Sequence, residues 1–523
     1  MKPKLEAPKA LALVLLTLTI ALGSTALPAF AQGPTPATPI QHLVVIFNEN
    51  ISFDHYFGTY PNAKNLKGEP KFTAAANTPI VNGLTSALMT NNPNLNPANG
   101  GVASNPFRLA PLQAVTSDQD HAYTDEQYAY DAGLLDLFPI HTGYGTTEPM
   151  AYFDGNTVTA MWNYAQFFAM SDNSYSTTFG PSTPGVINLT SGQTNGAINI
   201  LNGLGDEVSG GPDGSYTLIG DADPTGDVCS NPTRNQVNMS GPNIGDLLNA
   251  SGVTWGGFMG GFNLNIVNAN LTTGCFRSST GLAGTTADYV PHHSFFAYYP
   301  SVANPNHTRP NSIAEIGNAG PANHQYDVLD FFAAVSAGNF PAVSFIKAPA
   351  YQDGHAGYSD PLDEQTFVVN LVNFLENSPY WNSTAVVIMY DDSDGWYDHV
   401  MPPILNQSTG AADALTGAGA CGNAQMTLSG VNVLANPNAL GRCGYGPRQP
   451  LLVISPWARQ NFVDHSVTDQ TSVIHFIEDN WLGGQRLGSG SFDGIANSID
   501  QMFNFKSLRA NGKLILNPGT GEK

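Results

Sequence analysis

Four short apolar runs stand out along the chain, and none of them alternates with polar residues. They are 43–47 (LVVIF), 343–346 (VSFI), 385–390 (AVVIMY) and 451–455 (LLVIS), with 254–258 as a weaker candidate. Unbroken runs of this length are typical of strands covered on both faces, as in parallel sheets. Helical patterns lie between them, at 159–170, 244–250, 326–337, 364–376 and 471–481. The alternation predicts a doubly wound α/β core.

The segments between these elements are long and rich in Asn, Gly, Pro and Thr. We interpret 60–120, 200–240, 263–325 and 404–446 as loop excursions over one edge of the sheet. Loops of this length are either functional or mobile. No internal repeat and no convincing linker follows residue 40, so we expect one domain over residues 32–523.

The charge balance excludes several classes of partner. Charged residues make up 11% of the chain, and 19 Lys and Arg against 41 Asp and Glu give a formal net charge of −22. Nucleic acid and anionic lipid both require basic patches, so neither is an expected partner. No segment after the N-terminus is apolar enough to span a membrane. Few charges also make each acid or histidine near an apolar run a stronger site candidate.

The N-terminus has the pattern of a secretory signal peptide. Lys2, Lys4 and Lys9 precede the apolar stretch 11–22, and Ala29-Phe30-Ala31 offers a small-x-small cleavage site. We expect removal of residues 1–31 and a secreted or periplasmic protein. Its four cysteines favour disulfides in that compartment. Of three possible connectivities we favour Cys229–Cys275 and Cys421–Cys443, with free buried thiols as the alternative.

Acidic and amide side chains follow two of the predicted strands. Glu49 and Asn50 come directly after 43–47, while Asp391 and Asp392 come directly after 385–390. Ligands bind beyond the carboxyl ends of strands in open α/β sheets. Acids gathered there repel one another, so we expect a divalent cation held by these oxygen ligands.

Each cluster also has a plainer interpretation. Glu-Asn after a strand is often a helix cap, and 391–395 (DDSDG) resembles a turn or a calcium loop. It lacks the alternating acids and the final Glu of an EF-hand. The pair His292-His293 is equally consistent with the edge of the core. Taken together, the clusters favour a functional site.

A nucleophile candidate lies in 179–185 (FGPSTPG). Gly and Pro fix a tight turn, and Pro184 suits the first turn of a helix. A hydroxyl at Ser182 would then lie among free backbone N–H groups, which is a natural seat for phosphate. An ordinary Ser/Thr cap is the alternative. The chain has no Gly-x-Ser-x-Gly elbow and lacks the Arg of the sulfatase turn, so both of those classes are disfavoured.

Several long motifs resemble a bacterial phosphoesterase family that contains acid phosphatases and non-haemolytic-type phospholipases C. They are HLVVIFNENISFDHYFGTYPNA (42–63), DQDHAY (118–123), STTFGPSTP (176–184), DGHAG (353–357), YDDSDGWYDHVMPP (390–403), GPRQPLLVISPWARQNFVDH (446–465) and DQTSVIHFIEDNW (469–481). The resemblance implies a three-layer α/β fold with a mixed sheet like the alkaline phosphatase core. It also implies one metal ion, held by Glu49, Asn50, Ser182, Asp391 and Asp392, with Ser182 as nucleophile. His121, His292, His293 and His355 match the active-site histidines, and His121 is suggested by the resemblance alone.

Two departures bear on the substrate. Phospholipase-like members usually have Asp-Glu-Asn-Gly-Gly where this chain has 391–395 (DDSDG), the form of the acid phosphatase branch. They also usually have Asn where this chain has Gly185. Lys523 follows Trp481 by about forty residues, so we expect no extra β-rich C-terminal domain. The sequence therefore favours a phosphomonoesterase acting on a small phosphorylated substrate over a phospholipase C acting on phospholipid head groups.

The resulting hypothesis is attack by Ser182 on phosphorus, with a histidine, His292 or His355, protonating the leaving oxygen. Histidine chemistry predicts a mildly acidic optimum. Two other classes remain open. A non-catalytic, metal-stabilised binding protein explains the loops but not the Ser182 turn with four histidines. A glycosidase needs two separated acids without a metal, which fits crowded acids poorly.

Overall fold

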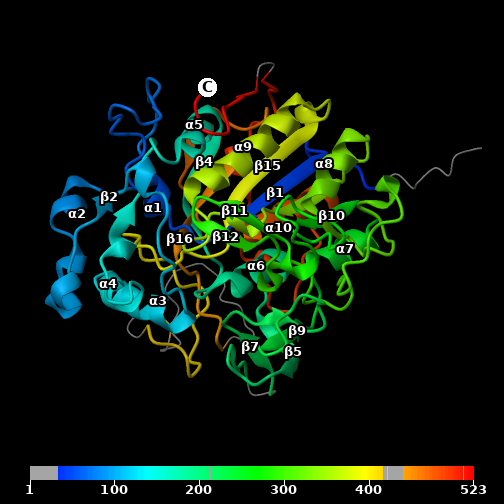
Figure 1. Ribbon diagram of the computed structural model, residues 1–523, viewed down its shortest axis with the longest axis horizontal. Coiled ribbons are helices and arrows are strands. Elements are labelled where there is room, and N and C mark those ends of the chain that lie inside the picture. The colour runs from blue at the N-terminus through cyan, green and yellow to red at the C-terminus, as the bar shows by residue number, and fades with distance from the viewer. Residues whose placement is uncertain (1–32, 212–213, 416–420, 422–439, 510–511) are drawn as a thin grey trace, which may run out of the picture. The chain divides into compact units, whose positions relative to one another are not determined.

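One large sheet organises the fold in the computed structural model, which describes residues 33–211, 214–415, 421, 440–509 and 512–523 (Figure 1). Within these residues the sheet has nine strands. Their spatial order is β13 (Gln325–Asp327), β10 (Trp255–Met259), β14 (Val343–Lys347), β1 (His42–Asn48), β15 (Thr384–Tyr390), β16 (Arg448–Ile454), β4 (Ala169–Tyr175) and β17 (Phe462–Asp464), with β18 (Thr468–Asp469) also pairing with β4. All five apolar runs predicted as strands lie in this sheet.

The sheet is mixed, as the resemblance implied. Strands β13, β10, β14, β1 and β15 run parallel, whereas β16 pairs antiparallel with both β15 and β4. β4 therefore runs in the same direction as β1 and β15. The carboxyl ends of β14, β1, β15 and β4 consequently meet at one edge of the sheet, which is where ligands bind in open α/β folds.

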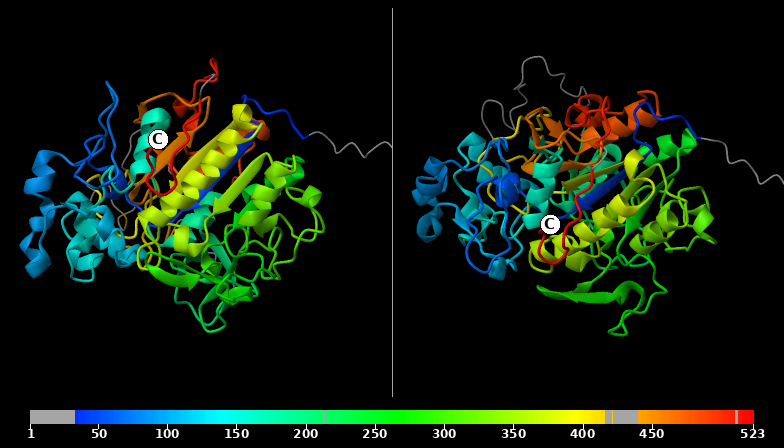
Figure 2. Two further views of the ribbon diagram at one scale, coloured as in Figure 1. Left: turned by 45° about the horizontal axis from the view of Figure 1, so that its top comes forward. Right: turned by 90° about the horizontal axis from the view of Figure 1, so that it is seen from above.

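Helices cover both faces of the sheet, which confirms the doubly wound α/β prediction. α5 (Thr159–Phe167) contacts α9 (Pro361–Asn377) on one side, near α8 (Val328–Ser336). α6 (Ser182–Ser191) contacts α7 (Ile244–Ala250) and α10 (Thr471–Trp481) on the other. Figure 2 shows the strands between the α9 and α10 layers. The remaining short helices are α1 (Phe53–Phe57), α2 (Ser86–Thr90), α3 (Tyr123–Tyr130) and α4 (Phe138–His141).

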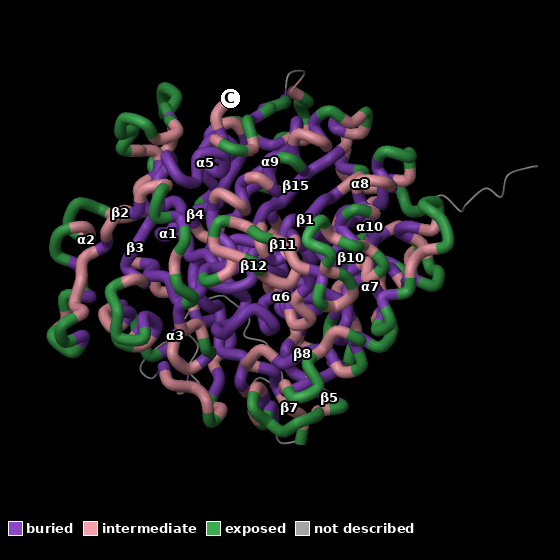
Figure 3. The backbone as a smooth tube through the Cα atoms, viewed as in Figure 1, coloured by how far each residue is buried: buried purple, intermediate pink, exposed green. Residues whose placement is uncertain are grey.

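The core lies between the sheet and these two layers. Every residue of β14, β15 and β16 is buried, and so is every residue of β1 after His42 (Figure 3). A strand with no exposed face has no reason to alternate apolar and polar positions. This burial is why the four runs appeared unbroken in the sequence.

Several strands were not predicted. β4 is a buried strand of mainly polar residues (AMSDNSY), and the helix expected over 159–170 ends at Phe167 before it. The excursion around 200–240 contains a five-stranded sheet in the order β6 (Glu207–Ser209), β7 (Tyr216–Leu218), β5 (Asn195–Leu201), β9 (Gln236–Met239) and β8 (Asp223–Pro224). Two smaller pairs are β11 (Ser278–Gly281) with β12 (Gly284–Ala287), and β2 (Phe107–Arg108) with β3 (Ala151–Tyr152).

Both favoured disulfides are present. Cys229 pairs with Cys275 and Cys421 pairs with Cys443, with Cα–Cα distances of 5.2 and 5.7 Å. No described helix is long and apolar enough to cross a bilayer. The predicted signal peptide, residues 1–31, lies outside the described residues, so its cleavage near Ala31 stays a prediction.

Candidate active site

The two acid clusters leave neighbouring strands at the same edge of the sheet. Asn48 at the end of β1 lies opposite Tyr390 at the end of β15. The backbone continues this pairing one step further, because the Asp391 N–H donates to the Asn48 carbonyl at 3.1 Å. Asp391 Oδ1 in turn accepts from the Asn50 N–H at 2.9 Å. The structure thus brings Glu49-Asn50 and Asp391-Asp392 together at the carboxyl ends of two strands, as the acids that follow these two apolar runs suggested.

The side-chain amide of Asn50 is held in place with its oxygen, Oδ1, unpaired among the described residues. Its φ of 64° lies in the left-handed region, which Asn adopts more readily than most residues. The side-chain N–H₂ donates to Asp394 Oδ1 at 2.9 Å, which fixes the orientation of the amide. Asn50 Oδ1 is buried and makes no hydrogen bond with any described residue. An oxygen oriented and left unsatisfied in this way is available to a ligand.

Ser182 contacts the acids from the helix that follows a third strand, β4. It is the first residue of α6, which follows β4 through the turn 176–181. Its Oγ donates to Glu49 Oε2 at 2.9 Å and lies 3.2 Å from Asp392 Oδ2. The hydroxyl proposed as nucleophile is therefore in direct contact with two of the proposed metal ligands.

Gly185 explains how α6 approaches so closely. A Cβ at this position would collide with the backbone carbonyl of Asp391, so only glycine fits without a shift of the helix. The departure noted in the sequence, Gly where phospholipase-like members have Asn, thus has a packing reason. It lets the first turn of α6 rest on the end of β15.

The turn before Ser182 is fixed by carboxylates. Gly180 has a φ of 113°, and its N–H donates to Glu126 Oε2 at 2.9 Å. Glu126 Oε1 accepts from Ser393 Oγ at 2.6 Å, which ties this turn to the turn after β15. The Thr183 N–H donates to Asp221 Oδ1 at 2.9 Å. That amide was expected to be free for phosphate, and it is already occupied by a carboxylate.

Glu49 is completely buried and contacted at both oxygens. Oε2 accepts from Ser182, and Oε1 lies 3.1 Å from His293 Nδ1. Lys347, the last residue of β14, also contacts Oε1, and its Nζ lies 3.5 Å from Asp391 Oδ2. The ammonium offsets part of the negative charge gathered at the strand ends.

The remaining charge and the donor atoms fit a hard divalent cation. Asn50 Oδ1 and Asp391 Oδ2 are buried without a hydrogen-bond partner among the described residues. Burial and the neighbouring Asp391 carboxylate raise the pKa of Asp392, and burial raises the pKa of Asp394. The two carboxylates are therefore costly to ionise unless a positive charge, such as a bound cation, lies beside them. Carboxylate, amide and hydroxyl oxygens are the ligands that such a cation prefers.

His292 and His293 lie on a short 3₁₀ turn (Pro291–His293) beside the nucleophile turn. The His292 carbonyl accepts from Thr183 Oγ1 at 3.3 Å, and its ring Nδ1 lies 3.6 Å from Asp223 Oδ1. His293 is buried against Glu49. Burial, followed by the positive charges around it, lowers the pKa of His293 well below its ordinary value.

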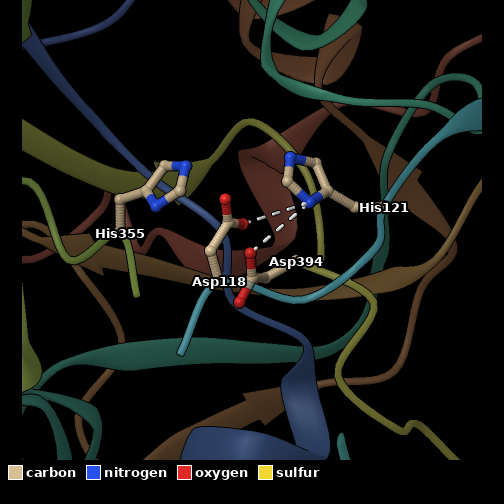
Figure 4. Close-up of side chains that lie close together, drawn as sticks. All are labelled: Asp118, His121, His355 and Asp394. Carbon is tan, nitrogen blue, oxygen red and sulfur yellow. Dashed lines mark ion pairs between the residues drawn. The ribbon is translucent and has the colours of Figure 1, made fainter. Parts of the chain in front are cut away.

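His121 and His355 gather with Asp118 and Asp394, and Figure 4 shows the four side chains close together. His121 Nδ1 lies 3.5 Å from Asp394 Oδ1, 3.8 Å from Asp118 Oδ1 and 2.8 Å from the Gln119 carbonyl. Because a carbonyl only accepts, Nδ1 of His121 carries a proton and is not available as a metal ligand in this arrangement.

The two histidines have opposite electrostatic environments. Burial alone would lower the pKa of His121, but the carboxylates of Asp392, Asp394 and Asp118 raise it well above its ordinary value. Burial lowers the pKa of His355 to about 4. The His355 Nδ1 donates to the Ala356 carbonyl at 2.5 Å, so Nε2 carries the lone pair of the neutral ring. His121 therefore favours its protonated form, whereas His355 favours its neutral form.

A cavity of about 370 Å³ adjoins the nucleophile turn. Its walls include His121, Tyr144, Pro181, Asp206 and Asp221. Tyr144 is 69% exposed, so the cavity opens to solvent beside an aromatic ring. Of the nine site residues predicted from the sequence, His121 lines this cavity directly, and Ser182 follows its wall residue Pro181 in the chain.

Two further groups with metal-ligand chemistry are already satisfied. Arg448 is fully buried and pairs with Asp54 and Asp398, whose neighbour His399 also contacts Asp54. Asp227 and His307 pair at 3.0 Å near Cys229, whose sulfur is in a disulfide. Both groups are internal ion pairs rather than open sites.

Sequence reasoning missed the residues that support the site. They are Glu126, Asp221, Asp223, Arg234, Lys347 and Asp394. Three of them had a sequence hint: Lys347 follows the apolar run 343–346, Asp394 lies within the turn 391–395, and Glu126 follows DQDHAY on α3. Asp221, Asp223 and Arg234 come from the 200–240 excursion, whose return to the site has no periodic signal.

Comparison with known proteins places the chain among phosphoesterases. The family model described as the Phosphoesterase family matches residues 40–482. The non-hemolytic phospholipase C of Pseudomonas aeruginosa is 26% identical over 84% of this chain and 54% of its own length. Phospholipase C A of Mycobacterium tuberculosis is 23% identical over 91% of this chain and 80% of its own length. The chain spans about half the length of the first of these relatives.

Solved structures with partial likeness include an alkaline phosphatase superfamily protein from Vibrio parahaemolyticus. It is 14% identical, with a TM-score of 0.25 over 79% of this chain and 77% of that one. Murine ectonucleotide pyrophosphatase/phosphodiesterase 5 is 12% identical, with a TM-score of 0.31 over 66% of this chain and 95% of that one. The match over residues 40–482 shows that the chain belongs to the Phosphoesterase family, as its motifs predicted.

Proposed function

We propose that the protein is a secreted, metal-dependent acid phosphatase that hydrolyses phosphomonoesters through a phosphoserine on Ser182. The contact of Ser182 Oγ with Glu49 and Asp392, at 2.9 and 3.2 Å, carries this proposal. It supports the proposal because the hydroxyl of Ser182 contacts two carboxylates that would hold the cation. Membership in the Phosphoesterase family supports a phosphoester substrate.

A divalent cation bound by Glu49, Asn50, Asp391 and Asp392 would lower the pKa of the Ser182 hydroxyl and neutralise charge on the phosphate. The chain's own residues do the rest. The first turn of α6 aims Ser182 Oγ, and Gly185 keeps that turn against β15. Glu49 and Asp392 accept the hydroxyl hydrogen bond and so orient the oxygen before attack.

In the first step Ser182 Oγ passes its proton to Glu49 Oε2, which accepts its hydrogen bond, and forms a bond to phosphorus while the bond from phosphorus to the ester oxygen breaks. The leaving oxygen takes a proton, and we assign its donor as His121, whose surrounding carboxylates keep it protonated. His355, one of the two donors expected from the sequence, has its pKa lowered to about 4 and suits the opposite role.

In the second step water attacks the phosphoserine and releases inorganic phosphate. His355 Nε2 carries a lone pair and accepts a proton from that water. The bond between Ser182 Oγ and phosphorus breaks, and the serine oxygen takes its proton back from Glu49 Oε2. A low pKa at His355 and a raised pKa at His121 allow the pair to work together in mild acid.

The two disulfides support export to an oxidising compartment. The Asp-rich turn after β15 supports the phosphatase branch, because Asp394 both orients Asn50 and faces His121. A phospholipase C is the second candidate, favoured by the names of the relatives above.

One comparison tests the proposal. The metal-loaded mature protein is assayed at pH 5 for phosphate release from p-nitrophenyl phosphate and for phosphocholine release from phosphatidylcholine vesicles. We expect the monoester to be the better substrate by kcat/KM. Exclusive hydrolysis of the lipid would establish the phospholipase, and no hydrolysis of either would leave a binding protein.

A further inference from the structure

Arg234 places a guanidinium group at the edge of the proposed site. It lies in the loop between β8 and β9, two residues before Gln236. Its Nε donates to the Asp221 carbonyl at 2.8 Å and lies 3.7 Å from Asp223 Oδ1. The head of the side chain is therefore anchored through one of its three nitrogens.

The same two aspartates hold the catalytic residues. Asp221 Oδ1 accepts from the N–H of Thr183, the neighbour of Ser182. Asp223 Oδ1 lies 3.6 Å from His292 Nδ1 and 3.7 Å from Arg234 Nε. Arg234 and His292 thus both lie near Asp223 Oδ1. The neighbouring Asp221 binds the residue that follows Ser182.

The rest of the guanidinium is uncommitted. The Arg234 side chain is 39% exposed, and its two terminal nitrogens make no hydrogen bond with any residue that the structure describes. By contrast, Arg448 and Arg277 bond through their terminal nitrogens to buried carboxylates. Two free donors on a planar fork match two oxygens of a phosphate group.

Arg234 also provides a positive charge near an acidic cavity. The chain carries a net charge of −22, and the cavity beside Ser182 has Asp206 and Asp221 in its walls. The charge of Arg234 acts on both of these aspartates and on His293. An anionic substrate entering an acidic opening requires a local positive charge to offset repulsion.

We propose that Arg234 binds a non-bridging oxygen of the substrate phosphate and thereby selects phosphomonoesters, which have three non-bridging oxygens, over phosphodiesters, which have two. This inference rests on the proposed function. A diester has one non-bridging oxygen fewer for the two terminal nitrogens to bind, so it gains less from the guanidinium. Arg234 would then be a specificity-determining residue contributed by the five-stranded insertion.

Binding of inorganic phosphate tests the contact without turnover. Calorimetric titration compares the metal-loaded Ser182→Ala protein with the Ser182→Ala/Arg234→Gln and Ser182→Ala/Arg234→Lys proteins. A hydrogen bond to a charged group contributes about 1.5–3 kcal/mol, so we expect roughly tenfold to hundredfold weaker binding for the Gln protein. The Lys protein should fall between. Arg309→Gln is the control, because Arg309 pairs only with Asp330 on α8.

Kinetics with Ser182 intact test the selection. Arg234→Gln should lower kcat/KM for p-nitrophenyl phosphate by the same factor and for bis-p-nitrophenyl phosphate by much less. Added guanidinium chloride should restore part of the monoester activity. Unchanged phosphate binding in the Gln protein would overturn the inference, as would equal losses on both substrates, which would indicate support of Asp221 instead. Neither result bears on Ser182, whose own substitution tests the proposed function separately.

Discussion

Gly185 lies directly against the backbone carbonyl of Asp391, and no side chain fits between them. This contact sets the distance between the first turn of α6 and the end of β15. It therefore fixes where Ser182 Oγ stands relative to Asp392. The proposed nucleophile and the acids come from distant parts of the chain, and the contact of Gly185 with Asp391 brings them close together.

Replacing Gly185 with Ala or Asn should disturb both stability and activity. Forcing a side chain into a packed contact costs roughly 1–3 kcal/mol of unfolding free energy, and α6 must shift to relieve it. We expect lower chemical-denaturation stability and a large loss of kcat. Gly494→Ala is the control, because a Cβ there meets open space. An Asn variant with normal stability and turnover would contradict the packing argument.

Ser182→Ala should abolish turnover and preserve the fold. The substitution removes the only atom that forms the proposed phosphoserine, so we expect kcat to fall on the order of 10⁴-fold or more. Melting curves and metal content should stay near those of the wild type. Thr183→Ala is the matched comparison, since Thr183 Oγ1 bonds to the His292 carbonyl and not to the acids. Near-normal activity of the Ser182 variant would move the nucleophile to Thr183.

Asp391→Asn combined with Asp392→Asn should empty the cation site. The two carboxylates supply ligand oxygens and charge that amides do not. Elemental analysis of the purified double variant should find little bound metal, and a chelator should no longer change its melting temperature. Asp479→Asn, a substitution at a partly exposed ion pair, provides the control. Wild-type metal content in the double variant would rule out this ligand set.

Glu364 makes stability depend on pH in a defined direction. It is buried beneath the site and accepts hydrogen bonds from Asn48, Tyr56 and Tyr390. Burial raises its pKa to about 7. The folded state therefore binds the proton more tightly than the unfolded state does. The stability from this proton is fully present below about pH 4.5 and is lost as the pH rises through 7.

We expect the unfolding free energy to fall between pH 5 and pH 8, with Glu364 contributing up to about 3 kcal/mol. Glu364→Gln should flatten this dependence, because an amide does not titrate. Urea denaturation at several pH values measures the slope. If the variant kept the wild-type slope, other buried carboxyls such as Glu478, whose pKa burial raises to about 9, would carry the effect.

The sequence predicted those parts of the site that follow directly from apolar strands. Glu49, Asn50, Asp391 and Asp392 were located because β1 and β15 are buried on both faces and therefore unbroken in hydrophobicity. β4 was missed since its polar residues are buried by partners far along the chain. Asp172, for example, accepts from the Asn82 N–H at 2.7 Å and faces His465.

The site residues that lie in the loops could not be predicted from the sequence for a similar reason. Asp221 and Arg234 return to the site through pairing within the five-stranded insertion, and no local pattern encodes that return. The free N–H groups expected around Ser182 illustrate the limit. Helix geometry leaves the first N–H groups of α6 without a partner inside the helix. It does not reveal that the Thr183 N–H is already bound by the Asp221 carboxylate, which comes from another part of the chain.

The disulfide between Cys229 and Cys275 links two loops that both supply the site. Cys229 lies in the segment that holds Asp223 and Arg234, and Cys275 lies upstream of His292 and His293. Closing this 46-residue loop restricts the unfolded chain and holds the two segments together. If the protein is exported as proposed, the chain lacks that tether while it is still in a reducing cytoplasm. Oxidation after export would then complete the proposed site, so that activity would begin outside the producing cell.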